Sequence, residues 1–166
     1  TEEDLDRIYD TIDTLQFEEL VPYYLGYKGS IDKTDKNAYI SRGIYHWIDN
    51  ETVEITELPI GTWTEDYKEM LESMITNNQH NLKSFENHYT SKNVRFIIHF
   101  NANAKAALQD TFETTFKISS TKNLSINNMH LFNEKCAIQK YNNTTDIIKE
   151  WANVRIRKYF ERKNYQ

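Results

Sequence analysis

Apolar residues recur at helical spacing near both ends of the chain. Leu5, Ile8, Tyr9, Ile12 and Leu15 share one face of a helix drawn through the opening segment, which predicts an amphipathic or linker helix there. The same spacing returns at residue 143 or 144 and continues almost to the last residue, with no Gly or Pro to stop it. It is followed by Ile147, Ile148, Trp151, Ala152, Arg155, Tyr159 and Arg162. The pattern therefore predicts a long C-terminal helix.

Alternation of apolar and polar residues predicts antiparallel strands in the middle of the chain. Residues 37–48 are rich in Tyr, Ile and Trp, and residues 52–55 alternate, so we expect a hairpin that turns at Asp49 and Asn50. Residues 94–100 place Val and aromatic or Ile residues at every second position, which is typical of a strand with one buried face. Residues 129–132 and 137–141 predict a second hairpin, turning at 133–135, which adds two strands to the same sheet.

Helices are predicted on either side of these strands. Residues 22–31 contain Pro and Gly and should lead the chain into extended structure. Thr62 and Glu65 match a capping box, and five apolar residues between 67 and 75 lie on one face of the helix that it would start. Residues 102–112 predict a helix started by Asn101 or Asn103, whereas residues 76–93 and 117–128 look like irregular connections. The predicted fold class is α+β, an antiparallel sheet flanked by helices and ending in a long C-terminal helix.

Composition and charge narrow the range of possible functions. A chain of 166 residues fits one compact domain. Its net charge of -5 argues against a free-standing nucleic-acid binder, so any DNA contact must be local. The chain has no apolar run of the roughly 20 residues that span a membrane, an acidic N-terminus unlike a signal peptide, and one cysteine. We therefore expect no membrane partner, an intracellular location and a buried, unreactive Cys136.

Basic residues are unevenly spread along the sequence. Lys28, Lys33, Lys36 and Arg42 cluster after the acidic opening segment, and five basic residues crowd positions 155–163. Blocks of this kind are more often solvated faces than binding sites.

Compact catalytic motifs are absent from the sequence. It contains no Gly-rich phosphate loop, His-Glu-x-x-His or Gly-x-Ser-x-Gly arrangement. Glu51, Glu54 and Glu57 near His46 are candidates for an acid/base or metal cluster in a small hydrolase, but their alternation along a strand favours a solvated face. His80 and His88 are interpreted as surface residues. We predict no catalytic residue and no metal ligand in this chain.

Residues 28–31 carry a different chemistry. Gly29 would let a phosphate approach the backbone, Lys28 would supply charge, and Ile31 at a bend would serve as an apolar wedge that enters between base pairs and kinks the duplex. On spacing alone, Ile31 is more often a core strand residue than a wedge.

Several blocks of the sequence, in a fixed order, resemble the type IIA DNA topoisomerases. Residues 22–31 are similar to a Pro-Trp-Tyr segment followed by Gly-Thr-Ile. Residues 54–64, Glu-Ile-Thr-Glu-Leu-Pro-Ile-Gly-Thr-Trp-Thr, followed by Tyr67-Lys68-Glu69, resemble the long signature of eukaryotic and large-virus topoisomerase II. Residues 116–118, 128–132 and 147–163 resemble later blocks. The resemblance covers residues 20–163 and implies the tower or shoulder region of the breakage-reunion core, after the winged-helix domain.

The resemblance implies roles for particular residues. Ile31 matches the isoleucine that intercalates and bends the gate duplex, and we expect it to be exposed without DNA. It implies DNA contacts at Lys28, Gly29, Ser30, Lys117, Ser119, Ser120, Thr121, Lys122, Asn127 and Asn128. It also implies a division into a linker helix at 1–20, a DNA-supporting domain at 21–143 and the start of an exit-gate coiled coil at 144–166.

The sequence departs from the family pattern at two minor positions and lacks the catalytic machinery. Tyr23 and Ser30 stand where Trp and Thr are common, and both replacements keep the chemistry. The Arg-Tyr pair that attacks DNA, the acidic magnesium cluster and the ATPase module are not in these residues. Mg²⁺ and ATP are therefore implied only for the parent enzyme.

The resemblance also implies partners and a location. The partners are double-stranded DNA, the rest of the topoisomerase chain and a second copy in a homodimer. The location is the nucleus for a cellular eukaryote, or the host cell or virion for a virus. A protein-interaction module with no DNA role is the alternative function.

Overall fold

The chain forms two compact units, each built from helix and antiparallel strands. The structure, a computed structural model, describes residues 7–8, 10–12, 14, 17–34, 38–120 and 124–166. Residues 22–125 form the central unit, and residues 1–21 with 126–166 form the terminal unit. The predicted α+β class is confirmed, but the strands among these described residues lie in three separate sheets rather than one. The predicted division at residues 20 and 143 stays a prediction about domains.

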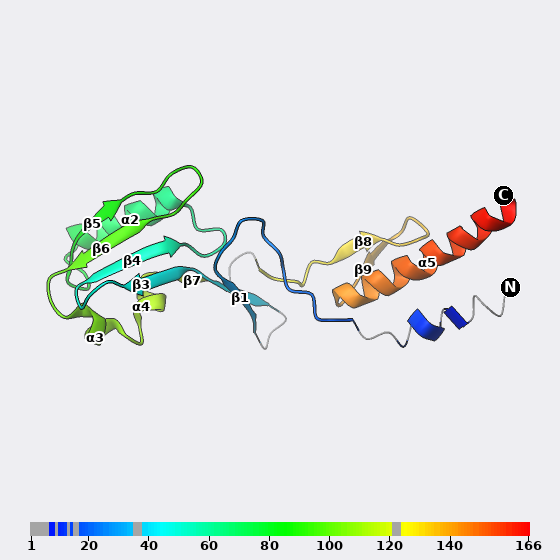
Figure 1. The fold of residues 1–166 in the computed structure, drawn as a ribbon, viewed down its shortest axis with the longest axis horizontal. Coiled ribbons are helices and arrows are strands. Elements are labelled where there is room, and N and C mark those ends of the chain that lie inside the picture. The colour runs from blue at the N-terminus through cyan, green and yellow to red at the C-terminus, as the bar shows by residue number, and fades with distance from the viewer. Residues whose placement is uncertain (1–6, 9, 13, 15–16, 35–37, 121–123) are drawn as a thin grey trace. The chain divides into compact units, whose positions relative to one another are not determined.

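A four-stranded sheet holds the core of the central unit. Its order is β3-β4-β6-β5 and all its neighbours are antiparallel (Figure 1). The predicted hairpin is formed by β3 (Ile44–Trp47) and β4 (Thr52–Glu57), and the predicted single strand is β6 (Phe96–Phe100). The edge strand β5 (Leu82–Asn87) lies in a segment predicted to be an irregular connection. That prediction was wrong because a register shift between Leu82 and Ser84 breaks the alternation that reveals a strand.

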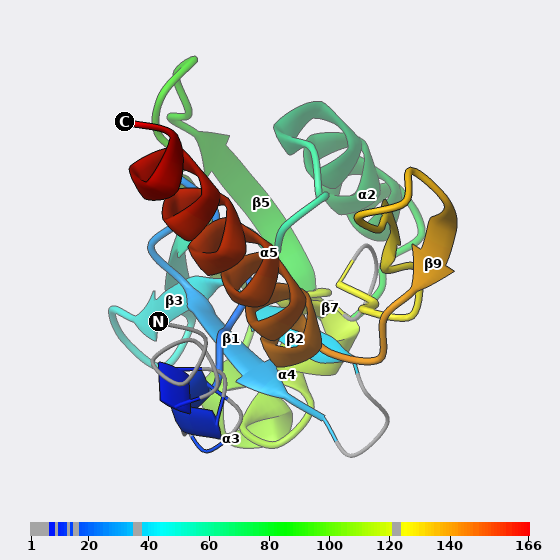
Figure 2. The ribbon, with the colours of Figure 1, turned by 90° about the vertical axis from the view of Figure 1, so that its right-hand side faces the viewer.

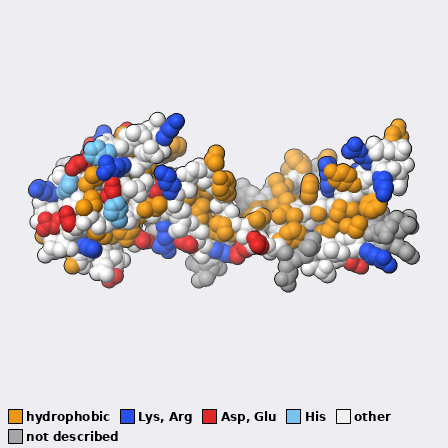
Figure 3. Space-filling view, in the orientation of Figure 1, with side chains coloured by type: hydrophobic (Ala, Val, Ile, Leu, Met, Phe, Trp, Pro, Cys, Tyr) orange, Lys and Arg blue, Asp and Glu red, His pale blue; other side chains and the backbone are white. Residues whose placement is uncertain are grey.

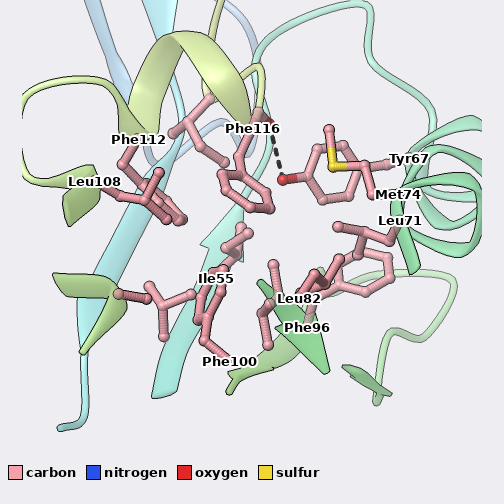
Figure 4. Close-up of a cluster of buried hydrophobic side chains, with 14 of the residues drawn as sticks. Ile55, Tyr67, Leu71, Met74, Leu82, Phe96, Phe100, Leu108, Phe112 and Phe116 are labelled. Carbon is pink, nitrogen blue, oxygen red and sulfur yellow. Dashed lines mark hydrogen bonds between the residues drawn. The ribbon is translucent and has the colours of Figure 1, made fainter. Parts of the chain in front are cut away.

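Alternation along β4 and β6 puts one face of this sheet in the core. Val53 pairs with Ile98 and Ile55 with Phe96, and all four side chains are fully buried. Figure 4 shows how aromatic rings from the helical side meet this face. Phe112 and Phe116 stack with ring centroids 4.7 Å apart. Burying this apolar area is the main favourable contribution to the stability of the unit.

Helix α2 (Thr64–Thr76) packs on the same face through Tyr67, Leu71 and Met74. The Tyr67 hydroxyl donates to the carbonyl of Phe116 over 2.8 Å, the dashed line in Figure 4, and burial raises the pKa of this phenol. The predicted capping box was wrong. The helix begins one residue later than expected, so Trp63 is the N-cap and no side chain caps the helix.

The predicted helix over residues 102–112 is two short helices. These are α3 (Ala104–Leu108) and α4 (Phe112–Thr115), and Asn103 is the N-cap of the first without a side-chain bond. Asp110 and Thr111 lie between them, and both residue types have low helix propensity. The break turns Leu108 and Phe112 into the core.

A second, three-stranded sheet has the order β1-β2-β7 (Figure 2). Its strands are β1 (Ser30–Lys33), β2 (Tyr39–Arg42) and β7 (Ser119–Ser120). The segment predicted as one strand over residues 37–48 is therefore divided between two sheets at Gly43. A Cβ at this position would overlap the carbonyl oxygen of Glu57 at the end of β4. Only Gly therefore allows the backbone at residue 43 to come so close to β4.

The terminal unit contains a hairpin and a long helix. The predicted hairpin is confirmed as strands β8 (His130–Phe132) and β9 (Ile138–Lys140). Among the described residues it pairs with no other strand, so it does not extend the sheet as predicted. The predicted helix is confirmed as α5 (Thr144–Tyr165), whose N-cap Asn143 accepts a hydrogen bond from the Asp146 amide.

Two other predictions concern the terminal unit. Arg7, Ile8, Asp10, Thr11, Ile12 and Thr14 are helical, which agrees with a helix in the opening segment. The predicted helix positions Leu5, Tyr9 and Leu15 lie outside the described residues. Cys136 is exposed rather than buried, because it lies in the hairpin turn with a positive φ of 58°.

Candidate nucleic-acid interface

The three-stranded sheet brings two of the predicted DNA-contact segments together. Within it, Ile31 pairs with Ser41, and Ser41 pairs in turn with Ser120. In the neighbouring row, Ser30 pairs with Arg42, and Arg42 with Ser119. Residues paired directly across strands project from the same face. Strand β2 therefore connects β1, which carries Ile31, to β7, which carries Ser119 and Ser120.

Ile31 is half-buried, whereas we expected it to be exposed. Its neighbours Ser30 and Asp32 are exposed, and β1 is an edge strand of the sheet. Ser41 is fully buried on the same face, where its hydroxyl accepts from the Ile60 amide at 3.1 Å and donates to the Ser120 carbonyl at 3.3 Å. Ile31 is thus neither sealed in the core nor fully open to solvent.

Gly29 is required by a close contact within the protein. A Cβ at this position would overlap the Arg42 carbonyl oxygen and the Tyr27 hydroxyl. That hydroxyl donates to the same Arg42 carbonyl over 2.6 Å. Burial first, and the Glu57 carboxylate second, raise the pKa of the Tyr27 phenol, which keeps it protonated as a donor. The backbone of β2 approaches Gly29 closely, and the approach of a phosphate at Gly29 stays a prediction.

The basic residues near this sheet are partly neutralised. Arg42 pairs with Asp32 at 3.3 Å and with Glu113 at 2.7 Å. Lys28 is exposed, and its backbone amide lies 3.4 Å from a Glu57 oxygen. Lys36 lies outside the described residues. The surface beside Ile31 therefore combines positive charge with carboxylates that a polyanion would have to displace or avoid.

A cleft of about 550 Å³ opens beside β7 within the central unit. Lys117, Ser119 and Ser120 line one side, and Gly61, Thr62 and Asp66 lie among the other lining residues. Lys117 is exposed and has a positive φ of 50°. Sequence reasoning did not place Thr62 or Asp66 at a cleft, because Thr62 was assigned to a capping box and Asp66 to the helix that follows it. Their position just after Gly61 is a local signal for a turn.

The remaining predicted contact residues are Thr121, Lys122, Asn127 and Asn128. Thr121 and Lys122 lie outside the described residues. Asn127 and Asn128 are exposed and belong to the terminal unit, and the Asn128 side chain contacts His130 Nδ1 at 3.0 Å.

Of the carboxylates considered for a hydrolase, Glu54 forms ion pairs on the open face of the four-stranded sheet. Glu54 contacts His46 at 2.9 Å and Arg95 at 2.6 Å. On the same face Glu86 contacts both His88 and His99, and these two hydrogen bonds hold the pKa of its carboxyl below the usual value.

Possible metal-binding clusters and membrane-spanning helices were sought among the described residues. No group of three or more His, Cys, Asp or Glu side chains among them could hold a metal ion. None of the helices they form is long and apolar enough to cross a membrane.

Comparison with known proteins points to one family. The family of the DNA gyrase/topoisomerase IV A subunit matches residues 2–166. DNA topoisomerase 2 of Plasmodium falciparum is 38% identical over 148 residues, which cover 88% of this chain and 10% of that protein. DNA topoisomerase 2 of Arabidopsis thaliana is 36% identical over 86% of this chain, again 10% of the relative. The chain thus spans about a tenth of the length of these relatives.

A solved structure gives the same result for the fold. The crystal structure of the Plasmodium falciparum topoisomerase II DNA-binding, cleavage and re-ligation domain superposes with a TM-score of 0.81 and 36% sequence identity. The match covers 99% of this chain and 23% of that one.

Proposed function

Because this chain belongs to the type IIA DNA topoisomerase family, we propose that it supports and bends a DNA duplex within a longer enzyme that passes one duplex through another. The observation that carries the proposal is the register of the three-stranded sheet. It aligns half-buried Ile31 with the hydroxyl-bearing strand β7 across β2, beside the cleft that Lys117 also lines.

Bending by an apolar wedge fits this arrangement. Ile31 would enter a base step from the minor groove, which costs unstacking and bending energy of several kcal/mol. Contacts along the bent duplex would offset that cost. The residues that we propose to make them are Lys28, Gly29, Ser30, Lys117, Ser119, Ser120, Thr121, Lys122, Asn127 and Asn128. Contacts of these groups to phosphates carry no sequence information, which suits an enzyme that acts at many sites.

The chemistry of strand passage is proposed to belong to other parts of the parent enzyme. We place the Arg-Tyr pair, the Mg²⁺ site and the ATP site outside this chain, because it matches only 10% of the length of its relatives. Mg²⁺ would supply charge stabilisation where the phosphodiester breaks. The residues of this chain bind and orient the duplex for that step. The parent enzyme would act in the nucleus if its source is a cellular eukaryote.

The C-terminal helix is proposed to begin the coiled coil of a homodimer's exit gate. None of the 22 residues of α5 is buried, and Trp151 is 63% exposed. A helix with uncovered apolar side chains is stabilised when another helix covers them. The rest of the topoisomerase chain and a second copy are therefore proposed partners.

Replacing Ile31 with Ala in the parent enzyme tests the wedge. We expect the variant to fold normally, because Ile31 is only half-buried, and to bend DNA less, because Ala is too short to hold a base step open. Energy transfer between dyes at the two ends of a gate duplex measures the bend.

Ile44→Ala is the matched control for this experiment. Ile44 is 37% exposed and lies in β3, outside the three-stranded sheet, so the same change there should leave the bend unaltered. Equal energy transfer for the Ile31 variant and the unmodified enzyme would falsify the wedge role. Loss of energy transfer in both variants would point to a general folding defect instead.

A further inference from the structure

Basic side chains gather on the C-terminal half of α5, in the terminal unit. Residues 155–166 contain five Lys or Arg and a single carboxylate, although the whole chain has a net charge of -5. Figure 3 shows Lys and Arg side chains over this part of the helix. Arg155, Lys158 and Arg162 line a shallow hollow of about 180 Å³ together with Tyr159. We call these three basic residues the basic stripe.

The spacing of these residues puts them on one face of the helix. Positions 158 and 159 each lie three or four residues from both 155 and 162, so they neighbour these two positions on the helix surface, and all four residues are exposed. The guanidinium of Arg155 lies 4.8 Å from the centre of the Tyr159 ring and donates to its hydroxyl at 3.2 Å. This contact orients one cation of the stripe in advance.

Few carboxylates neutralise the stripe. Lys158 pairs with Glu161 at 2.7 Å, and in the described part of the chain neither Arg155 nor Arg162 forms an ion pair. Arg157, by contrast, is engaged with Glu134 of the β8–β9 turn. The hairpin therefore uses a cation on an adjoining face of α5 and leaves the stripe open.

The helix macrodipole does not account for the stripe. Cations near a helix C-terminus are favourable, but the effect falls off within the last turn. Helix α5 ends at Tyr165, so the dipole explains Arg162 and Lys163 only. Arg155 and Lys158 lie further back along the helix and need another reason to be there.

We propose that the basic stripe binds backbone phosphates of a DNA duplex and forms a contact separate from the Ile31 sheet. From residue 155 to 162 the helix rises about 10.5 Å. That length matches roughly three phosphates along one strand of B-DNA, at about 3.4 Å of axis each. Three cations on an otherwise acidic chain concentrate attraction for a polyanion at one place. The contact requires neither intercalation nor bending.

The salt dependence of DNA binding by the full chain tests this proposal. The variant R155Q/K158Q/R162Q removes three charges and keeps helix propensity, which circular dichroism checks. Fluorescence anisotropy of a labelled duplex gives the slope of log K against log salt. We expect the slope to become shallower by about 2.7, which is about 0.9 for each phosphate that the variant no longer neutralises.

A matched variant removes the same charge from the central unit. Lys83, Lys92 and Lys105 are exposed there, so K83Q/K92Q/K105Q has the same net charge as the stripe variant. The proposal predicts an unchanged slope for this control. Equal losses in the two variants would reduce the effect to net charge and overturn the proposal.

Two further measurements identify the ligand and separate this proposal from the wedge. If the stripe variant binds duplex normally but loses binding to poly-glutamate, the stripe serves an acidic protein partner and the proposal fails. R155K/R162K keeps all the charges and should keep the slope. Ile31→Ala should alter the bend without altering the slope, so failure of either idea leaves the other standing.

Discussion

The central and terminal units differ sharply in how they treat apolar side chains. In the central unit, fifteen buried residues form one core cluster around the four-stranded sheet, and Phe116 has no exposed area. In the described part of the terminal unit, only Ile12 and Tyr141 are buried, and Phe132 is 72% exposed. The central unit therefore has an apolar core of its own as a source of stability, whereas the described part of the terminal unit leaves most of its apolar side chains at least partly exposed.

The largest expected effect comes from truncating a core aromatic residue. Phe116→Ala should lower the free energy of unfolding of the central unit by about 3–5 kcal/mol, because it removes ring contacts with Phe112 and Phe100 and leaves a cavity. Phe132→Ala in the terminal unit should change the free energy of unfolding of the central unit by less than about 0.5 kcal/mol. Hydrogen exchange of the β6 amides in urea measures both. A large loss with Phe132→Ala would break the comparison between the units.

A smaller effect is expected at the helix N-termini. Asn143→Ala should destabilise α5 by about 1 kcal/mol, because the Asp146 amide loses its acceptor. Thr62→Ala should change α2 by less than about 0.5 kcal/mol, since no side chain caps that helix. Amide exchange in the first turn of each helix reports the two changes. If Thr62→Ala proved the more destabilising substitution, the result would support the capping box that the sequence predicted.

The smallest effect concerns a contact within the terminal unit. The Tyr141 hydroxyl donates to Glu150 on α5 at 2.6 Å, and this bond to a carboxylate raises the pKa of Tyr141 to about 12. A phenol pKa that is higher in the folded state contributes stability below the ordinary value near 10, and that contribution is lost as pH rises through 12. Glu150→Gln should move the pKa back toward 10.

Nuclear magnetic resonance of tyrosines labelled at Cζ follows this titration, and Tyr141→Phe assigns the signal. An unchanged pKa in Glu150→Gln would mean that the carboxylate is not its cause. The same titration in Phe116→Ala should be unaffected, because the altered residue lies in the other unit.

Strands with clear alternation or a hairpin pattern could be predicted from the sequence, whereas β5, β7 and the division into separate sheets could not. Phe96 and Ile98 alternate with outward residues because helices cover only one side of β6. Strand β5 was not predicted because its bulge shifts the alternation at Leu82 and because its edge position leaves most of its side chains exposed to water. The β8–β9 hairpin was predicted, but its separation from the other sheets was not, because local patterns do not show which sheet a hairpin joins.

The candidate interface was predictable only in part. Ile31 and the serines of β7 were named through a resemblance between sequences, and their pairing lies beyond local pattern. The Ser41 hydroxyl reaches the Ser120 carbonyl across 79 positions of the chain, a contact that only the folded structure fixes. The ion pair between Arg42 and Glu113 was missed for the same reason, since Glu113 is 71 positions away.

Gly43 has a mechanical consequence. It is the single residue between β2 and β3, and its amide donates to the Ile118 carbonyl at 2.8 Å, next to β7. A strand that changes sheets within one residue leaves no slack between them. A force applied at Ile31 would therefore be transmitted through Gly43 to the aromatic core with little deformation. In the proposed role, the central unit would act as a rigid support against the elastic restoring force of a bent duplex.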